Sequence, residues 1–89
     1  GNNLCDAETG MGRYASAIAH CEAALALLVT EGRPDTDPER LLVESNLARA
    51  LGHGGSAREA LRRFVSVRER AAASQGEAAF PVTLQDFRT

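Results

Sequence analysis

The chain has 89 residues, of which 44% are hydrophobic and 25% are charged, and its formal net charge is −2. Its length allows one small domain, and its charge gives no support to a nucleic-acid partner. No apolar run approaches a membrane span and no charged-then-apolar leader opens the sequence, so we expect a cytoplasmic protein without a membrane partner.

The first two expected helices surround a glycine turn. A helical pattern begins almost at the first residue and breaks at Gly10 and Gly12. A second helix follows, because apolar residues recur on one helical stripe. The stripe contains Tyr14, Ala17, Ile18, Cys21, Ala24, Leu25 and Leu28. The segment 31–38, with one glycine and two prolines, ends this pattern.

The next expected helix begins at Pro38. Asp37 is placed to cap it, and a proline in the first helical position costs nothing because that N–H has no partner within the helix. Its apolar residues are Leu41, Val43, Leu47, Ala48 and Leu51. The glycines at positions 52, 54 and 55 predict its end.

A capping box, S-x-x-E at residues 56–59, predicts the start of a further helix. Its expected buried stripe is Ala57, Ala60, Leu61, Phe64 and Val67. We expect Gly76 to end this helix and Pro81 to begin another helical segment. No stretch alternates between apolar and polar residues as a strand does. The sequence therefore predicts an all-α fold of antiparallel helix hairpins.

A spacing of 43 residues relates the two halves of the chain. Asn3-Leu4 recurs as Asn46-Leu47. The same offset pairs Gly12 with Gly55, Ala17 with Ala60, Ile18 with Leu61, Cys21 with Phe64, Ala24 with Val67, Pro38 with Pro81 and Leu41 with Leu84. Such a repeat is typical of a supersecondary unit stacked on a copy of itself, since one unit cannot bury its apolar face alone.

Both repeats share one pattern of apolar and small residues around the glycine turn. The first reads Leu4-Cys5, then Gly12-x-Tyr14-x-x-Ala17-x-x-x-Cys21-x-x-Ala24, and the second reads Leu47-Ala48, then Gly55-x-Ala57-x-x-Ala60-x-x-x-Phe64-x-x-Val67. This pattern resembles the tetratricopeptide repeat (TPR) family. The spacing exceeds the usual value of about 34 residues. The longer loop ending in Pro38-Glu-Arg-Leu41, followed by Ser45-Asn-Leu-Ala48, is similar to the kinesin-light-chain-type variant. Cys21 and Ala57 depart from the pattern, because the family has larger residues there.

The resemblance implies a single α-solenoid domain, a TPR superhelix fragment. Its first repeat would cover about 1–37, its second about 38–80, and a third would start at 81–89. It also implies a protein–protein interaction module, not an enzyme, that binds a peptide or protein partner in a concave groove. Ten Arg and no Lys favour a GC-rich bacterial source, and a first residue other than Met suggests a piece of a larger signalling or regulatory protein. The alternative is a structural repeat segment that stacks on neighbouring domains or on a second copy without a ligand.

The first helix of each repeat is expected to line the groove. The candidate residues are Asn3, Asp6, Leu42, Asn46, Arg49, His53 and Arg88. The four between positions 42 and 53 are separated by four, three and four residues and share one helix face. The resemblance gives Asn3 and Asn46 the role of bonding a peptide backbone, and makes Arg49 and Arg88 candidate contacts for a carboxylate. Asn46 would alternatively cap or bridge helices.

Cys5 and Cys21 both occupy small, apolar positions of the first repeat. We expect reduced thiols in the core, because a disulfide scaffold of this size normally has four or more cysteines; a disulfide, a metal site and a catalytic role are the alternatives. His20 is adjacent to Cys21, so on a helix their side chains diverge by about 100°. The Gly-x-Gly-x-x-Ala run at 10–15 follows a helix, whereas a dinucleotide site needs a strand there. We expect no catalytic, metal or cofactor site.

Arginines are concentrated between residues 58 and 70. They suggest phosphate binding, but Glu59 precedes Arg62 and Arg63 by three and four residues, so intrahelical ion pairs are the simpler interpretation. Residues 1–45 contain eight acidic and three basic side chains, and residues 46–89 contain four acidic and seven basic ones. This asymmetry can orient a partner or a second copy, although solvated helix faces that happen to differ are the simpler explanation.

Two further expectations concern packing. The core should contain Leu47, Ala48, Leu51, Ala60, Leu61 and Phe64, packed between the paired helices. The last segment would present Val82, Leu84 and Phe87 without a following helix, so we expect the protein to self-associate at high concentration.

Overall fold

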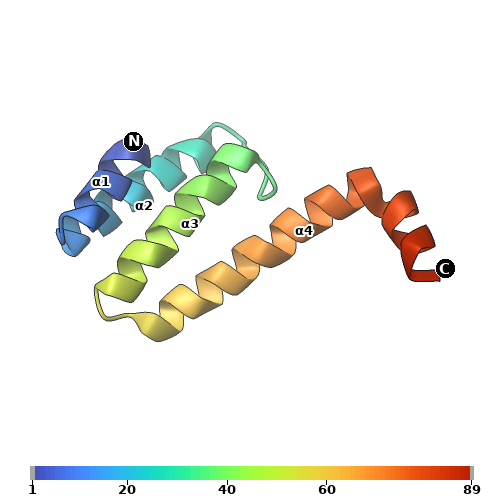
Figure 1. Cartoon of the computed structure of the whole chain (residues 1–89). Coiled ribbons are helices and arrows are strands. Elements are labelled where there is room, and N and C mark those ends of the chain that lie inside the picture. The colour runs from blue at the N-terminus through green and yellow to red at the C-terminus, as the bar shows by residue number, and fades with distance from the viewer. Residues whose placement is uncertain (1, 89) are drawn as a thin grey trace.

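The computed structural model describes the backbone of residues 2–88 and the side chains of residues 4–74. Between residues 2 and 88 the chain forms four helices and no strand: α1 (Asn2–Gly10), α2 (Tyr14–Thr30), α3 (Pro38–His53) and α4 (Ala57–Arg88). α3 contacts each of the other helices, and α4 packs against α3 (Figure 1). The prediction of an all-α fold is confirmed.

The turns of the two hairpins are the same structure displaced by 43 residues. Three successive amides donate to the last turn of the preceding helix: Met11 to Ala7, Gly12 to Thr9 and Arg13 to Glu8, and equivalently Gly54 to Ala50, Gly55 to Gly52 and Ser56 to Leu51. Gly12 and Gly55 have φ angles of 81° and 100°. Glycine adopts this left-handed conformation without the clash that a Cβ atom would cause. The sequence repeat is therefore also a repeat of backbone geometry.

The core lies between the two hairpins. Buried residues of α1, α2 and α3 meet there, namely Cys5, Ala17, Cys21, Leu47 and Ala50, with Ile18, Leu25 and Leu51 packed against them. Leu47 is only 1% exposed, and burial of such a side chain contributes about 2–3 kcal/mol. Ala48 and Ala60 are also buried. These positions agree with the expected core.

Leu61 and Phe64 were expected in the core but are 65% and 43% exposed. α4 instead buries Ala60 and Val67, which lie one helical heptad apart on its α3-facing stripe. Leu61 and Phe64 belong to a neighbouring stripe that α3 does not cover. The sequence pattern showed how wide the apolar surface is, but burial also depends on how many helices lie against it.

Cys5 and Cys21 form a disulfide, so the expectation of reduced thiols was wrong. The bond joins α1 to α2, with a Cα–Cα distance of 5.5 Å, and both residues are completely buried. The tight turn after Gly10 folds α1 back along α2 and brings the two cysteines together. A nine-residue helix is marginal alone. A cross-link across 16 residues stabilises it by about 3 kcal/mol in the chain-entropy account.

α4 continues through Gly76 and Pro81, where we expected one helix to end and another to begin. α2 ends at Thr30 and is followed by a glycine with positive φ, Gly32, and the 43-residue offset puts Gln75 at the equivalent place. A residue with a Cβ disfavours that conformation, so the helix end is not repeated. Pro81 removes one backbone donor, and the last part of α4 departs from the direction of its first part (Figure 1). The side chains of residues 82, 84 and 87 lie outside the described residues.

A buried carboxylate joins α3, α4 and the link between α2 and α3. Glu44 is 7% exposed and accepts two hydrogen bonds from Arg70, at 2.5 and 2.9 Å, and one from Arg40, at 3.1 Å. Burial alone would raise the pKa of Glu44, but the hydrogen bonds from both arginines outweigh burial and lower it. Arg70 and Arg40 also donate to the carbonyl oxygens of Asp35 and Arg33 in the link. Arg70 thus binds across helices, whereas an intrahelical pair was expected.

Other predicted local contacts are confirmed. Asp37 caps α3 by accepting a hydrogen bond from the Arg40 amide at 3.0 Å. Glu59 pairs with Arg62 and Arg63 along α4, at 3.7 and 3.1 Å. These contacts follow from spacings of three and four residues alone, which is why the sequence predicts them.

Candidate functional site

A polar hollow lies where the turn ends of the two hairpins meet. It has a volume of about 400 Å³ and is lined by Asp6, Thr9, Gly10, Tyr14, Arg49 and His53. The first three residues belong to α1, Tyr14 begins α2, and the last two lie on α3. Three helices and both hairpins therefore contribute to one site, which we call the polar hollow.

An exposed ion pair belongs to the polar hollow. The guanidinium of Arg49 contacts the carboxylate of Asp6, and their side chains are 46% and 55% exposed. Arg49 also donates to Oδ1 of Asn46 at 3.4 Å. Water screens the attraction between exposed charges, so such a pair contributes about 0–1 kcal/mol. A carboxylate on a ligand can therefore replace Asp6 beside Arg49 at little cost.

Two aromatic rings form another part of the lining. Tyr14 and His53 stack with their centroids 5.7 Å apart and their planes at 14°. Tyr14 directly follows the first turn, and His53 is the last residue of α3, just before the second. The stack therefore connects the two turns. It offers ring faces to an apolar or planar group, and the hydroxyl and imidazole nitrogens can form hydrogen bonds.

The sequence-predicted residues are partly brought together. Asp6, Arg49 and His53 line the polar hollow, and Asn46 is half-buried in contact with Arg49. Leu42 is 52% exposed on α3 and is not part of the lining. The side chains of the other two candidates, at positions 3 and 88, lie outside the described residues.

Sequence reasoning missed three lining residues, Thr9, Gly10 and Tyr14. It considered only the polar face of the first helix in each repeat. The signal for Tyr14 was its position directly after the glycine turn, because that turn places the first residue of α2 beside the end of α1. Thr9 itself is buried and donates to the carbonyl oxygen of Cys5 at 2.9 Å.

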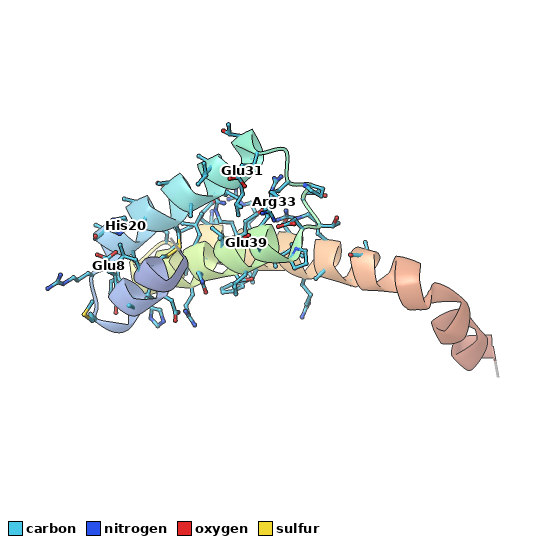
Figure 2. All side chains as sticks on the ribbon, turned by 90° about the horizontal axis from the view of Figure 1, so that it is seen from above. Glu8, His20, Glu31, Arg33 and Glu39 are labelled. Atoms are coloured by element: carbon cyan, nitrogen blue, oxygen red, sulfur yellow. A yellow bond between two sulfur atoms is a disulfide. The ribbon has the colours of Figure 1, made fainter. Side chains whose placement is uncertain are left out.

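A second polar cluster holds α1 on α2. Glu8 is 6% exposed, accepts a hydrogen bond of 2.6 Å from Ser16 and contacts Nδ1 of His20. Figure 2 shows Glu8 on α1 and His20 on α2 close together. The hydrogen bond from Ser16, followed by that with His20, lowers the pKa of Glu8. The carboxylate lies between the hydroxyl and the imidazole, whereas a catalytic triad has the imidazole between the other two.

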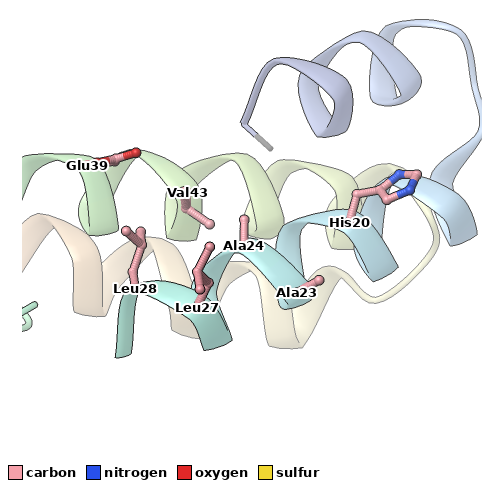
Figure 3. A pocket seen from close by; sticks show the side chains of 7 residues that line it. All are labelled: His20, Ala23, Ala24, Leu27, Leu28, Glu39 and Val43. Carbon is pink, nitrogen blue, oxygen red and sulfur yellow. The ribbon is translucent and has the colours of Figure 1, made fainter. Parts of the chain in front are cut away.

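An apolar hollow of about 320 Å³ lies between α2 and α3 (Figure 3). It is lined by His20, Ala23, Ala24, Leu27, Leu28, Glu39 and Val43. Leu28 and Val43 are buried, but Leu27 is 59% exposed. None of the predicted groove residues lines this hollow. Substitution of Leu27, which is exposed here and lies outside the polar hollow, therefore serves as a control for changes in the polar hollow.

Within the described part of the chain, no three His, Cys, Asp or Glu side chains gather in a way that would hold a metal ion. None of the helices described has both the length and the apolarity of a membrane span. The chain matches no family model, and no curated protein or solved structure is significantly similar to it. Functional inference therefore depends on the geometry of its own residues.

Proposed function

We propose that the chain is a TPR-type protein-interaction module that holds a peptide against the face formed by α1 and α3. The supporting observation is the polar hollow, where Asp6 on α1 meets Arg49 and His53 on α3. Asp6 and Arg49 are 43 residues apart and are thus equivalent positions of the repeat. Their contact means that equivalent faces of neighbouring helices form one continuous surface, as a bound peptide would need.

Three contacts of different chemistry are available to an extended peptide there. The amide of Asn46 can donate to and accept from a peptide backbone. Arg49 can form a charge-assisted pair with a side-chain or C-terminal carboxylate when that group replaces Asp6. The stacked rings of Tyr14 and His53 can pack against an apolar side chain. An acidic peptide with a neighbouring apolar residue suits this combination best.

Binding is proposed here in preference to catalysis. A nucleophilic serine needs a base that accepts its proton, but Ser16 donates to Glu8 and not to His20. Glu8 is held in the charged form by these contacts and serves to join two helices. The exposed charges of the polar hollow, in contrast, form only the weak Asp6–Arg49 pair and a hydrogen bond of 3.4 Å from Arg49 to Asn46.

We propose that the module works in an oxidising compartment, in place of the cytoplasm expected from the sequence. The Cys5–Cys21 disulfide supports this proposal, because such bonds persist in oxidising surroundings and are rare among cytosolic proteins. Thiol alkylation of the protein from its native cells, denatured in acid so that the buried cysteines are accessible and do not exchange, tests the compartment: the proposal requires both cysteines to resist alkylation until a reductant is added.

Selection from a library of random peptides displayed on phage tests the binding function. Peptides enriched on the wild-type protein should contain an acidic group. Asn46→Ala and Arg49→Ala should each weaken their binding by about tenfold, as loss of a central contact typically does. Asp6→Asn should strengthen it by up to about fivefold, because it releases Arg49 from an exposed pair.

Leu27→Asp is the matched control, since Leu27 is exposed on α2 outside the polar hollow. It should leave the affinity of the selected peptides unchanged. The proposal fails if no peptide is enriched, or if the enriched peptides bind equally well to the Asn46→Ala and Arg49→Ala variants.

A further inference from the structure

An exposed apolar stripe runs along α4. Leu61, Phe64 and Val65 are 65%, 43% and 41% exposed. Together with Ser45, Val67 and Arg68 they line a hollow of about 390 Å³. Positions 61, 64, 65 and 68 have the spacing of one helix face, and we call them the α4 stripe. Grouped large apolar side chains on a surface indicate an interaction site, and none of these residues lines the polar hollow.

Three of the four positions of the α4 stripe correspond to residues that are covered in the first hairpin, and the fourth, Val65, corresponds to the exposed Glu22. The 43-residue offset relates Ile18 to Leu61 and Cys21 to Phe64. The two hairpins have equivalent turn hydrogen bonds, so these positions lie at the same distance along the helix after equivalent turns. On α2, Cys21 is fully buried and Ile18 packs against the core. The difference arises because α3 lies on the surface of α2.

The helix that covers the first surface shows what chemistry fits the second. α3 packs there with a stripe of aliphatic and small residues: Val43, Leu47, Ala50 and Leu51, at spacings i, i+4, i+7 and i+8. Residues 81–88, which the repeat aligns with the start of α3, continue α4 and do not return to cover the stripe. A helix with the apolar pattern of α3, supplied by another molecule, has the shape to do so.

The charges around the stripe refine the choice of partner. Arg68 occupies the position that Leu25 has in the first hairpin, and Arg58 and Arg62 lie in the adjoining hollow with Glu69. Arg62 shares the carboxylate of Glu59 with Arg63, and among the described residues Arg58 and Arg68 form no ion pair. The rim is therefore basic overall, and acidic side chains complement it.

We propose that the α4 stripe binds an amphipathic helix of a partner protein, aliphatic along one face and acidic along its flanks. Apolar contact with Leu61, Phe64 and Val65 supplies the affinity, and Arg58, Arg62 and Arg68 select acidic flanks over basic ones. The α4 stripe would bind a helix, whereas the polar hollow would bind an extended peptide. The two sites share no lining residue, so one protein can bind both partners at once.

Two synthetic peptides test the proposal on the full chain. The first has the sequence of α3, residues 38–53, and the second differs from it by Arg40→Glu and Arg49→Glu. The second peptide is the more acidic one, because each Arg→Glu change lowers its net charge by two, and the two changes lower it by four. In NMR titrations at low salt, this acidic peptide should bind about tenfold more tightly than the first, since it lies opposite a basic rim. Shift changes should concentrate at residues 61–68, and the preference should shrink as salt is added.

Matched variants separate this surface from others. Leu61→Asp should weaken binding of the acidic peptide by about tenfold or more, whereas Leu27→Asp should not change it. Both residues are exposed, so neither variant should unfold. Arg58→Glu with Arg68→Glu should reverse the preference between the two peptides. Asn46→Ala should have no effect, which keeps this test independent of the polar hollow.

Three results would overturn the proposal. In the first, millimolar acidic peptide causes no shift changes at residues 61–68. In the second, Leu61→Asp binds the peptide as well as the wild type does. In the third, sedimentation equilibrium shows a wild-type dimer that Leu61→Asp dissociates, which would assign the α4 stripe to a second copy of this chain.

Discussion

The two hairpins share a turn and a register but are held together by different chemistry. In the first, a buried disulfide links α1 to α2, and Glu8 adds hydrogen bonds across the same pair. In the second, the positions equivalent to the cysteines are Ala48 and Phe64, and the ion pair of Glu44 with Arg70 joins α3 to α4. The same backbone unit thus tolerates either a covalent or an ionic link between its helices.

The hairpins also differ in how they are covered. α3 lies on the first hairpin and buries its outer stripe, while the equivalent stripe of the second hairpin stays exposed. Equivalent positions of the two hairpins therefore contribute very different amounts to the free energy of folding. Whether a position is buried depends on which helices pack against it and not on its place in the repeat. The experiments below measure the resulting differences in stability.

The largest difference should appear between Leu47→Ala and Phe64→Ala. Leu47 is 1% exposed between the hairpins, so its truncation should lower the free energy of unfolding by about 3–5 kcal/mol. Phe64 is 43% exposed, and its truncation should cost about 1 kcal/mol or less. Urea denaturation of both variants measures the two values. Equal losses would show that Phe64 is as well covered as Leu47.

Removal of the disulfide should have the next largest effect. The Cys5→Ala/Cys21→Ala variant should be about 2–4 kcal/mol less stable than the oxidised protein. Addition of a dithiol reductant should destabilise the wild type and leave this variant unaffected. Alkylation of the denatured protein checks the bond itself: two reactive thiols before reduction would contradict it.

A double-mutant cycle should show that the ionic link of the second hairpin is cooperative. Glu44→Gln leaves Arg70 without its buried carboxylate and should cost about 2–3 kcal/mol. Combining it with Arg70→Gln should cost less than the sum of the single changes, with a coupling of about 1–3 kcal/mol. Glu59→Gln, which breaks exposed pairs, should cost no more than about 0.5 kcal/mol. Additive losses at positions 44 and 70 would mean that the two side chains do not interact.

The smallest predicted effect is a pH dependence that comes from the first hairpin. The pKa of Glu8 is lowered in the folded state, so its contribution to stability is complete above its ordinary value of 4.5 and is lost as pH falls through the folded value. Glu8→Gln should therefore flatten the decline in stability below about pH 4.5. The exposed Glu22→Gln on α2 controls for the loss of one negative charge. An unchanged acid decline in Glu8→Gln would exclude this origin.

Much of the candidate site could be anticipated, because it depends on helix faces. Arg49 and His53 are four residues apart, and the repeat predicts Asp6 as the equivalent of Arg49. Their meeting in one hollow, and the contribution of Tyr14, depend on how closely α1, α2 and α3 approach one another. That approach is set by packing of small residues such as Ala17 and Ala50, which no spacing along the chain describes.

The sequence by itself determined the first three helices and the start of α4, the glycine turns, the Asp37 cap and the 43-residue register. Each of these arises from hydrogen bonds and backbone preferences that act within a few residues. Only the tertiary structure decided that Cys5 is bonded to Cys21, that Arg70 reaches Glu44, and that Phe64 remains exposed. These outcomes depend on which surfaces face one another and how many neighbours each has. Which surfaces face one another, and how many neighbours each has, is fixed only when chain segments far apart in sequence have come together.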